Sequence, residues 1–551
     1  MKIEIFKTNN FWIDNGLIGL YKILESIQVK MKLIDKEFKV EFKTIDNKQL
    51  LAVELVNCNK NEDENKENLT LILNTAKNLV VENYLTFTDN AGWFYQDNNY
   101  KIYRKTDFKM HLKPFFTGKV PETQGALIVP SSTSIEIGKR DRVMDRDEYA
   151  KFNDFLEKNK STIIESKKIT LTGKGYIDSP PKYNIGSEFD MDFLSGGSKF
   201  CNFGGTTFKN ADFITGMDYP FITGKSGELN FASYLESKPK ISSLYSFVAL
   251  FSFYNLYFQT NEKLKNYFVL YDEDMEELNV FYNVIQLNIN QIKENKYCNF
   301  ETYIIGTEYE SEALFGFLVS IYKQIKGKLS KDKRKGLYTK SVYLFSNDGN
   351  IFRDVKLYSS ISNLFELFDS FDNEDDEKFN FDQLLNMIKF FTKVIPGKIT
   401  KYDTIFRNKL CNDILNFRSI VKTIEWYMGE VRLKEDKNGS IAFLDKIISV
   451  YFKFIGINMK SEMVEMCKSL GNRIGRYCRE SENKGILFSI RNSKNRTEFL
   501  NILAESQFKT EISIGEEFFK ELPDSPEWEE YKSLVSIFGM NSYLYKKQEQ
   551  K

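Results

Sequence analysis

The chain has 551 residues and no net charge, because 77 lysines and arginines balance 77 aspartates and glutamates. This balance excludes a uniformly polybasic nucleic-acid binder, so any such role must come from local patches of charge. The single histidine, His111, excludes sites that need several histidines and leaves any Ser-His-Asp or Cys-His chemistry dependent on that one side chain. A hydrophobic share of 42% is enough for cores in about two to four domains.

The six cysteines show no paired spacing, and charged residues near the N-terminus interrupt any signal-peptide core. We therefore expect reduced thiols in a cytoplasmic protein. The stretch from Ile241 to Phe258 carries no charge and reaches the short limit of a membrane span, which is about 18 residues. Because this stretch contains several serines and tyrosines and has no second span beside it, we expect a buried helix and no membrane contact.

The pattern in residues 1–160 predicts an N-terminal α+β domain. Apolar and charged residues alternate on both sides of the turn at Asp35-Lys36, which predicts a hairpin with one solvated face. A second hairpin is predicted around Asp97-Asn98-Asn99, with Trp93–Tyr95 and Tyr100–Tyr103 as its strands. The other elements expected here are a helix over Gly16–Ile27, the first hairpin's strands over Val29–Leu33 and Phe38–Phe42, a strand over Leu50–Val56, a loop over Asn57–Asn68, and helices over Leu69–Tyr84 and Arg142–Lys158.

Two loops that contain glycine and proline are expected at 117–130 and 171–186. They carry isolated polar side chains on flexible backbone, and such side chains can reach base edges in a nucleic-acid groove. Lysines on surface loops are common, so each residue alone also fits ordinary solvated surface. The candidate base-reading residues are Lys119, Gln124, Lys174 and Asn184.

The middle region, residues 161–371, is also expected to be α+β, and it contains a glycine-rich knuckle over residues 195–231. Glycine is used where the backbone needs a positive φ or where another backbone comes close, so a compact irregular segment is predicted. Within it, Thr223-Gly224-Lys225-Ser226 resembles the end of a phosphate-binding loop. Tyr219 stands where that motif needs its first glycine, and Pro220 has no amide hydrogen, so we interpret the segment as a turn.

A second motif in the knuckle resembles one arm of a zinc knuckle. Cys201 is followed three residues later by Gly204, which stands where the second cysteine of a CxxC arm belongs. A structural zinc site requires four ligands, and the nearest other cysteine, Cys298, is distant and unpaired. We predict a metal-free turn with one buried cysteine, and we expect no metal and no cofactor in the chain.

A short strand is predicted over Tyr267–Tyr271, and it runs into the acidic residues Asp272, Glu273 and Asp274. Three carboxylates after a strand can bind a divalent ion. The same residues also fit a turn and the N-terminus of a helix, which we consider the better explanation. No motif of a hydrolase, kinase or nuclease is visible, so no catalytic residue is predicted.

Residues 372–378 are strongly acidic and predict a solvated linker. Beyond them, over residues 379–551, apolar residues recur at helical spacing, which predicts a C-terminal helical bundle. Ser525 with Pro526 predicts the start of the last helix, because proline is favoured at the first helical position. The whole chain is thus expected to be α+β, with hairpins in the N-terminal and middle regions and a bundle at the C-terminus.

Charge is unevenly spread over the bundle. From Lys389 to Arg496 there are 22 basic and 11 acidic residues, whereas from Thr497 to Lys551 there are 6 basic and 11 acidic ones. A basic helix face attracts phosphate backbone without reading sequence, although an ordinary solvated face has the same composition. The candidate phosphate-binding residues, all within one predicted helix, are Lys468, Arg473, Arg476 and Arg479.

Two blocks of the chain resemble one known family. The knuckle combines the degenerate Cys201 arm with an aromatic-Pro-Phe step at Tyr219-Pro220-Phe221 and with Asn230-Phe231. Near the N-terminus, Trp12-Ile13-Asp14-Asn15-Gly16-Leu17-Ile18-Gly19-Leu20 is similar to the W-x-D-x-G-x-x-G-L block that opens the family's members. The family is the large subunit of type I-B CRISPR Cascade, also called the CXXC–CXXC region family. This chain lacks the paired cysteines of that motif, and their absence puts a zinc site in doubt.

The resemblance implies a non-catalytic subunit of an RNA-guided surveillance complex. Such a subunit would contact the 5′ handle of a guide RNA, recognise the PAM in target double-stranded DNA and support R-loop formation. Its expected partners are the guide RNA, the target DNA, the other Cascade subunits and a separate helicase-nuclease that cleaves the DNA. The alternative from another class is a divergent metal-dependent phage-defence nuclease that uses the carboxylates of residues 272–274.

Overall fold

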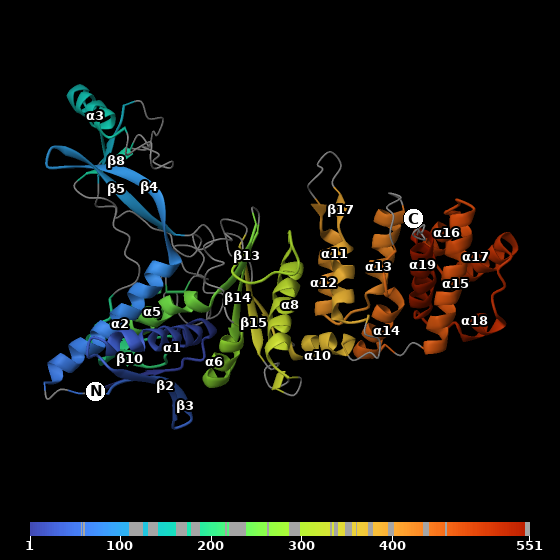
Figure 1. Ribbon diagram of the computed structural model, residues 1–551, viewed down its shortest axis with the longest axis horizontal. Coiled ribbons are helices and arrows are strands. Elements are labelled where there is room, and N and C mark those ends of the chain that lie inside the picture. The colour runs from blue at the N-terminus through green and yellow to red at the C-terminus, as the bar shows by residue number, and fades with distance from the viewer. Residues whose placement is uncertain are drawn as a thin grey trace. The chain divides into compact units, whose positions relative to one another are not determined.

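The computed structural model describes residues 1–56, 58, 61–108, 125–130, 141–160, 174–177, 188–214, 218–219, 239–261, 264–285, 298–330, 333–334, 340–347, 355–359, 361–372, 378–394, 402–433, 440–457 and 460–545. The chain forms two compact units (Figure 1). Unit 1 contains Met1–Phe300 and Lys340–Tyr358, and unit 2 contains Glu301–Thr339 and Ser359–Lys551. The chain therefore passes from one unit to the other three times, after residues 300, 339 and 358.

Unit 1 mixes helices with several small sheets. Its helices are α1 (Phe11–Lys32), α2 (Glu62–Tyr84), α3 (Arg146–Lys158), α5 (Ser243–Phe251) and α6 (Met275–Val284), with the 3₁₀ turns η1 (Met191–Leu194) and η2 (Ser252–Asn255). Its strands are β1 (Lys2–Phe6), β2 (Phe38–Ile45), β3 (Lys48–Leu55), β4 (Leu85–Gln96), β5 (Asn99–Phe108), β6 (Ala126–Ile128), β7 (Arg142–Val143), β8 (Lys174–Ile177), β9 (Gly196–Phe200), β10 (Thr207–Phe208), β11 (Ala211–Phe213), β12 (Lys240–Ser242), β13 (Tyr257–Thr260), β14 (Lys265–Tyr271), β15 (Ser341–Asn347) and β16 (Lys356–Tyr358).

The N-terminal sheet has the order β1-β3-β2 and is antiparallel throughout. The hairpin predicted around Asp35-Lys36 was wrong, but the strands predicted over Phe38–Phe42 and Leu50–Val56 lie in β2 and β3, which pair across a turn in which Asp46 and Asn47 both have positive φ. The predicted strand over Val29–Leu33 was wrong, because helix α1 continues to Lys32. Met31 is buried one turn after the buried Ile27, so the alternation seen in that short stretch is one edge of a helical face.

Helix α1 lies in the centre of unit 1 and packs on α5 (Figure 1). A Cβ on Gly16 would come within 2.4 Å of the Val248 carbonyl oxygen, so the two backbones meet directly. Buried polar groups add specific links, since the Asn15 side-chain amide donates to the Ser252 carbonyl at 3.2 Å and Asn15 Oδ1 accepts from the Tyr282 hydroxyl at 2.8 Å. The glycine and asparagine of the opening block thus fix the contact between α1 and α5.

Helix α2 begins at Glu62, inside the stretch predicted as a loop. The charged residues that suggested a loop form the first turn of the helix, where acidic side chains stabilise the exposed amides. The second predicted hairpin is confirmed, since β4 and β5 pair on both sides of Asp97 and Asn98, which have positive φ. These strands belong to a sheet of order β5-β4-β8-β6-β7, and Trp93 and Phe152 of α3 lie in the core under it.

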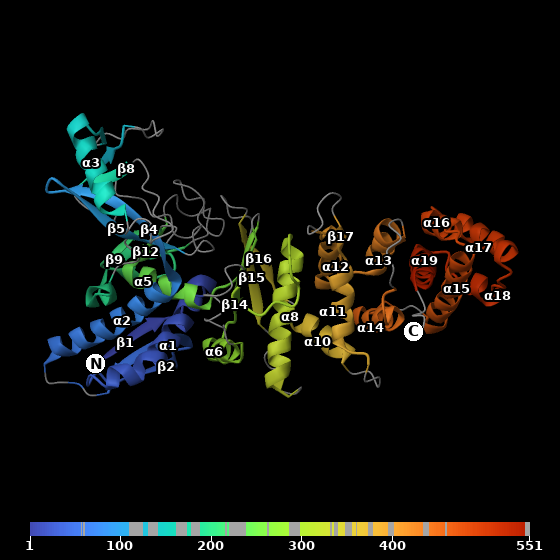
Figure 2. The same ribbon diagram turned by 45° about the horizontal axis from the view of Figure 1, so that its top comes forward.

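A four-stranded sheet of unit 1 has the order β13-β14-β15-β16 and is antiparallel (Figure 2), and the strand pairs β9-β10 and β11-β12 form two small sheets of their own. Its central strands are almost completely buried, and Phe11 at the start of α1 stacks on Tyr343 of β15 with ring centroids 4.1 Å apart. Strand β15 comes from the segment 340–358, so this segment is part of the core of unit 1 even though helix α8 precedes it in sequence.

The apolar stretch predicted as one buried helix is buried but divided. It forms α5, then the 3₁₀ turn η2 and then the edge strand β13. Serines account for the start and the bend, because Ser242 caps α5 by accepting from the Tyr245 amide and Ser252 donates its hydroxyl proton to the Trp12 carbonyl. In the described part of the chain, no helix is both long and apolar enough to span a membrane.

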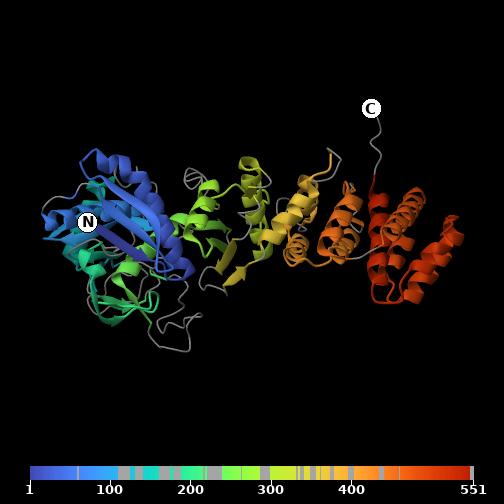
Figure 3. The ribbon, with the colours of Figure 1, turned by 90° about the horizontal axis from the view of Figure 1, so that it is seen from below.

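Unit 2 is built from helices, and its orange and red C-terminal helices pack alongside one another (Figure 3). Its elements are α8 (Glu310–Lys328), α10 (Ile361–Phe371), α11 (Phe381–Phe390), the hairpin β17 (Lys393–Val394) and β18 (Tyr402–Asp403), α12 (Ile405–Leu415), α13 (Val421–Tyr427), the π-helical turn η3 (Met428–Leu433), α14 (Leu444–Ile455), α15 (Ser461–Glu480), α16 (Gly485–Asn492), α17 (Arg496–Thr510), α18 (Glu516–Glu521) and α19 (Trp528–Leu544). The α+β class predicted from the sequence is confirmed.

A buried ion pair joins α8 to α12 within unit 2. Arg407 Nε lies 2.7 Å from Glu312 Oε2, and both side chains are almost completely buried. The Thr404 hydroxyl and the Tyr309 amide donate to the other carboxylate oxygen of Glu312, and Arg407 also donates to the Gly306 carbonyl at 2.8 Å. The helices predicted beyond residue 379 are therefore tied to α8, which comes earlier in the chain.

Candidate nucleic-acid interface

The basic face predicted on the bundle lies on α15, which packs against α19 over much of its length. The two helices pack so closely that a Cβ on Gly475 would come within 2.1 Å of the Gly539 carbonyl oxygen, so this position requires glycine. Met463, Cys467, Ile474 and Cys478 of α15 are buried, as the helical spacing of the sequence predicts. The opposite face of α15 therefore carries its polar and basic side chains.

The four basic residues predicted on this helix fall into two pairs with different surroundings. Lys468 is held by two carboxylates, with Nζ 2.7 Å from Asp445 Oδ2 and 3.4 Å from Glu465 Oε2. Arg473 donates to the Ser513 carbonyl at 2.9 Å. These contacts engage both side chains within the protein, and neither residue lines the pocket that contains the other two arginines.

Arg476 and Arg479 share a pocket between α15 and the C-terminal end of α19. The pocket has a volume of about 510 Å³. We call it the arginine pocket, and it is lined by Ser440, Asn472, Arg476, Arg479, Asn541, Ser542 and Tyr545. All of its described lining residues are neutral or basic, so nothing among them neutralises the two guanidinium groups.

The two arginines of the pocket are held differently. Arg479 Nη1 donates to the Ser542 carbonyl at 3.1 Å and to the Tyr545 carbonyl, so its guanidinium caps the C-terminal end of α19. The Arg476 side chain is exposed, and within the described residues it has no hydrogen bond or ion pair. One arginine is therefore fixed in place while the other is available to bind an anion, and Asn472 and Ser440 offer further polar groups beside them.

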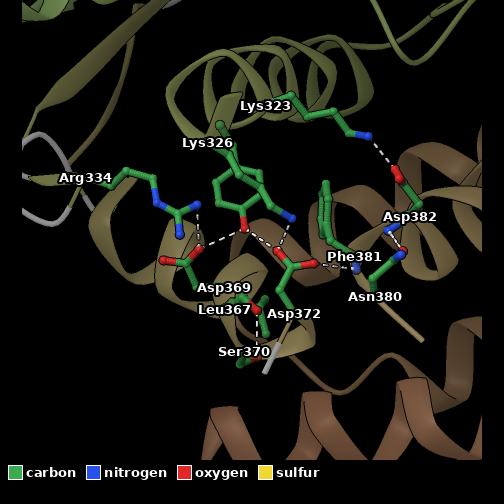
Figure 4. Close-up of polar contacts among 11 residues, drawn as sticks. Lys323, Lys326, Arg334, Leu367, Asp369, Ser370, Asp372, Asn380, Phe381 and Asp382 are labelled. Carbon is green, nitrogen blue, oxygen red and sulfur yellow. Dashed lines mark hydrogen bonds and ion pairs between the residues drawn. The ribbon is translucent and has the colours of Figure 1, made fainter. Parts of the chain in front are cut away.

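The acidic segment predicted as a solvated linker begins inside a packed cluster (Figure 4). Asp372 Oδ2 lies 2.5 Å from Lys326 Nζ and 2.8 Å from the Tyr322 hydroxyl, which also lies 2.9 Å from Asp369 Oδ1. Burial and the two carboxylates raise the pKa of Tyr322 far above its usual range, so the hydroxyl keeps its proton. Asp372 thus links α10 to α8, and residues 373–377 lie outside the described residues.

The carboxylates of residues 272–274, named in the nuclease alternative, have structural partners. Asp272 Oδ2 lies 2.8 Å from Nζ of the fully buried Lys340, which also contacts Glu277 at 2.6 Å. Asp274 caps α6 by accepting from the Glu276 and Glu277 amides. The turn and helix N-terminus favoured by the sequence are therefore present, and the described residues contain no group of three or more His, Cys, Asp or Glu placed to hold a metal ion.

The candidate base-reading residues fall mostly on parts of the chain that the structure leaves out. Lys119, Gln124 and Asn184 lie outside the described residues, as do the Thr223–Ser226 segment and His111. Lys174 is described, and it begins strand β8 with Ile128 as its cross-strand partner. The expectation that Lys174 lies on a loop was wrong, because the four residues Lys174–Ile177 pair with β4 and β6.

The knuckle is described over residues 195–214 and 218–219. Cys201 is buried, as predicted, and its Sγ accepts from the Ser242 amide at 3.3 Å. The Trp12 indole of the opening block donates to the Asp218 carbonyl at 3.2 Å. The two blocks on which the family resemblance depends are therefore in contact within unit 1.

A further basic pocket lies at the N-terminal sheet, and the sequence analysis missed it. It collects Lys2 and Lys7 from either end of β1, Lys48 from the start of β3, and the knuckle residues Gly204 and Phe208. The alternation of Lys2, Glu4 and Phe6 with buried isoleucines was a visible strand signal. Nothing in the sequence indicated that the knuckle would face this strand.

A scan against models of protein families and a search of curated proteins each found no match to this chain.

Proposed function

We propose that this protein is a non-catalytic nucleic-acid-binding subunit, similar to the large subunit of type I-B CRISPR Cascade. The observation that carries the nucleic-acid proposal is the arginine pocket. Arg476 and Arg479 lie about one helical turn apart on α15, and none of the described lining residues is acidic. Guanidinium groups match phosphate oxygens in both geometry and charge, so the pocket suits a phosphate of a nucleic-acid backbone.

The pocket is suited to binding the phosphate backbone of a nucleic acid and not to recognising its base sequence. Arginine contacts to phosphate position a protein on a nucleic acid without carrying base information. In the proposed complex, recognition of the PAM is assigned to Lys119, Gln124, Lys174 and Asn184, and pairing with the guide RNA reads the rest of the target. Recruitment of the other Cascade subunits and of a helicase-nuclease belongs to the same proposal, which rests on the resemblance of the two blocks.

Salt-dependent binding of the full-length protein to DNA duplexes tests the proposal. Replacing Arg476 with alanine should weaken binding to all duplex sequences alike and lower the slope of log affinity against log salt by about one phosphate contact. Arg473→Ala is the matched control, because it removes the same charge from the same helix outside the pocket. Equal affinities and equal slopes for wild type and Arg476→Ala would show that the pocket does not bind phosphate backbone.

The nuclease alternative is tested on the same preparation. Supercoiled DNA is incubated with the protein in the presence of Mg²⁺ or Mn²⁺ and, as a control, with a chelator. A scaffold subunit leaves the DNA intact in all three conditions. Cleavage that requires the metal and is lost in Asp274→Asn, which keeps a side-chain oxygen to cap α6, would favour the nuclease and overturn the non-catalytic proposal.

A further inference from the structure

The basic pocket at the N-terminal sheet of unit 1 has a volume of about 670 Å³. We call it the lysine pocket. Its lining comes from three parts of the chain, namely β1 with the following turn, the start of β3, and the knuckle with α5. The volume lies within the range of roughly 300–1,000 Å³ that is typical of small-molecule sites.

The charge of the lysine pocket is positive. Its lining contains Lys2, Lys7 and Lys48, and Glu4 is the acidic residue among the described ones. Glu4 forms an ion pair with Lys2, and Lys7 Nζ lies 3.0 Å from Asn9 Oδ1, which is neutral. The Lys48 side chain is exposed, and within the described residues it makes no hydrogen bond or ion pair. Lys7 Nζ also lies 5.8 Å from the centre of the Tyr271 ring. Within the described residues neither Lys7 nor Lys48 forms an ion pair, so both charges are available for an anion.

Aromatic side chains stand next to these lysines. Phe6 is 38% exposed, and Phe208 of the knuckle is partly exposed and lies against the Tyr245 ring in an edge-to-face contact with centroids 5.9 Å apart. The Tyr245 hydroxyl donates to the Phe6 carbonyl at 3.2 Å, so the ring is locked between the strand and the knuckle. The pocket thus combines cationic groups with an accessible aromatic wall.

The turn that carries Lys7 is held in place by a buried carboxylate. Asp14 Oδ1 accepts from the Thr8 amide at 2.8 Å and from the Thr8 hydroxyl at 3.0 Å. Asn9 adopts φ of 59°, and its neighbour Asn10 caps α1. The polar residues on this side of the pocket are therefore positioned before any ligand binds, which lowers the entropic cost of binding.

We propose that the lysine pocket binds a nucleoside phosphate. The phosphate lies between Lys7 and Lys48, where ammonium groups attract its charge, and the base contacts the aromatic wall of Phe6 and Phe208. The hydroxyl of Thr206 and the Asn9 amide can bind the sugar or the phosphate. This proposal does not depend on the arginine pocket, which lies in the other unit.

Calorimetric titration of the full-length protein with adenosine 5′-monophosphate tests this proposal, with adenosine as the matched ligand without phosphate. We expect saturable binding of the nucleotide that is at least about ten-fold tighter than binding of adenosine, because the ion pairs require the phosphate. Lys48→Ala should weaken nucleotide binding by about ten-fold. The control Lys39→Ala, an exposed lysine of β2 outside the pocket, should leave it unchanged.

A second arm distinguishes a free nucleotide from the end of a strand. Short single-stranded RNA with a 5′-phosphate is compared with the same RNA carrying a 5′-hydroxyl. Tighter binding of the phosphorylated strand than of the mononucleotide assigns the pocket to a strand end, and the reverse order assigns it to a free nucleotide. The proposal is overturned if no phosphate ligand binds saturably at millimolar concentration, if adenosine binds as tightly as its phosphate, or if Lys48→Ala and Lys39→Ala behave alike.

Discussion

The arginine pocket and the lysine pocket are both basic, yet they are assembled in different ways. Arg476 and Arg479 lie three residues apart on one helix, so the helical repeat alone brings them to one face. The residues of the lysine pocket come from strands β1 and β3 and from the knuckle, which are far apart in sequence. A site on one helix can be recognised in a sequence, whereas a site assembled from several segments requires the fold.

The two pockets also differ in what holds them rigid. The arginine pocket depends on the contact between α15 and α19, where Gly475 allows two helix backbones to meet. The lysine pocket depends on two hydrogen bonds to backbone, in which Asp14 accepts from the Thr8 amide of the turn and Tyr245 donates to the Phe6 carbonyl of β1. A substitution that destabilises unit 2 should therefore impair the arginine pocket and spare the lysine pocket. A substitution that destabilises unit 1 should do the reverse.

The largest expected effect comes from the buried ion pair of unit 2. Replacing Glu312 with alanine leaves Arg407 buried without its carboxylate, and such a break costs about 3–5 kcal/mol of stability. We expect the thermal transition of unit 2 to fall, DNA binding through the arginine pocket to weaken, and nucleotide binding in unit 1 to persist. Differential scanning calorimetry and the two binding assays measure these outcomes. A uniform loss of both binding activities would show that the two units do not unfold separately.

A smaller effect is expected from the pH dependence of unit 1. Burial raises the pKa of Asp14 from 3.8 to about 6, although hydrogen bonds from Thr8 and the charge of Lys7 partly oppose this rise. The folded state therefore holds the proton more tightly than the unfolded state. The resulting stabilisation is fully present below about pH 4 and is lost as the pH rises through 6, and a shift of this size corresponds to ~3 kcal/mol.

Asp14→Asn tests this dependence, because asparagine keeps the oxygen that accepts from Thr8 and does not ionise. Between pH 4 and pH 7.5, the unfolding free energy of the variant should fall less than that of the wild type, as measured by urea unfolding at several pH values. Asp63→Asn at the exposed start of α2 is the control and should follow the wild type. Parallel curves for Asp14→Asn and wild type would mean that Asp14 is ionised in the folded protein at pH 5.

The smallest effect separates the two arginines of the arginine pocket. Arg476→Ala should weaken DNA binding without a change in thermal stability, because its side chain makes no hydrogen bond or ion pair within the described residues. Arg479→Ala should lower stability by about 0.5–2 kcal/mol as well, because it removes the cap on α19. Thermal melts with and without a short DNA duplex measure both quantities. Identical melting temperatures for the two variants would contradict the capping role.

The sequence predicted local features well and long-range ones poorly. The hairpin at Asp97-Asn98, the helical repeat of α15 and the buried state of Cys201 follow from turn chemistry, periodicity and apolar surroundings, and all three are confirmed. The errors at Val29–Leu33 and at Glu62 arose because short alternating or charged stretches fit more than one element. Packing of Met31 decides for helix at Val29–Leu33, and the favourable position of acidic side chains at a helix N-terminus decides at Glu62.

The same limit applies to the candidate sites. Spacing placed Arg476 beside Arg479, but it could not indicate that Arg473 donates to Ser513 or that Lys468 is held by Asp445. Those partners lie on other helices and are brought near only by the bundle. The acidic run at Asp372 was likewise predicted to be solvated because its partner Lys326 lies far earlier in the chain.

The passage of the chain between the units has a consequence for synthesis on the ribosome. Strand β15 belongs to the core of unit 1, but it emerges after helix α8 of unit 2 has already been made. Until Asn347 is released, β14 lacks its neighbour β15, and the α8 face that contacts α12 stays uncovered until Leu415 is released. Both units are thus incomplete at the same time on a nascent chain that exposes apolar surface, which is the situation in which chaperones are needed.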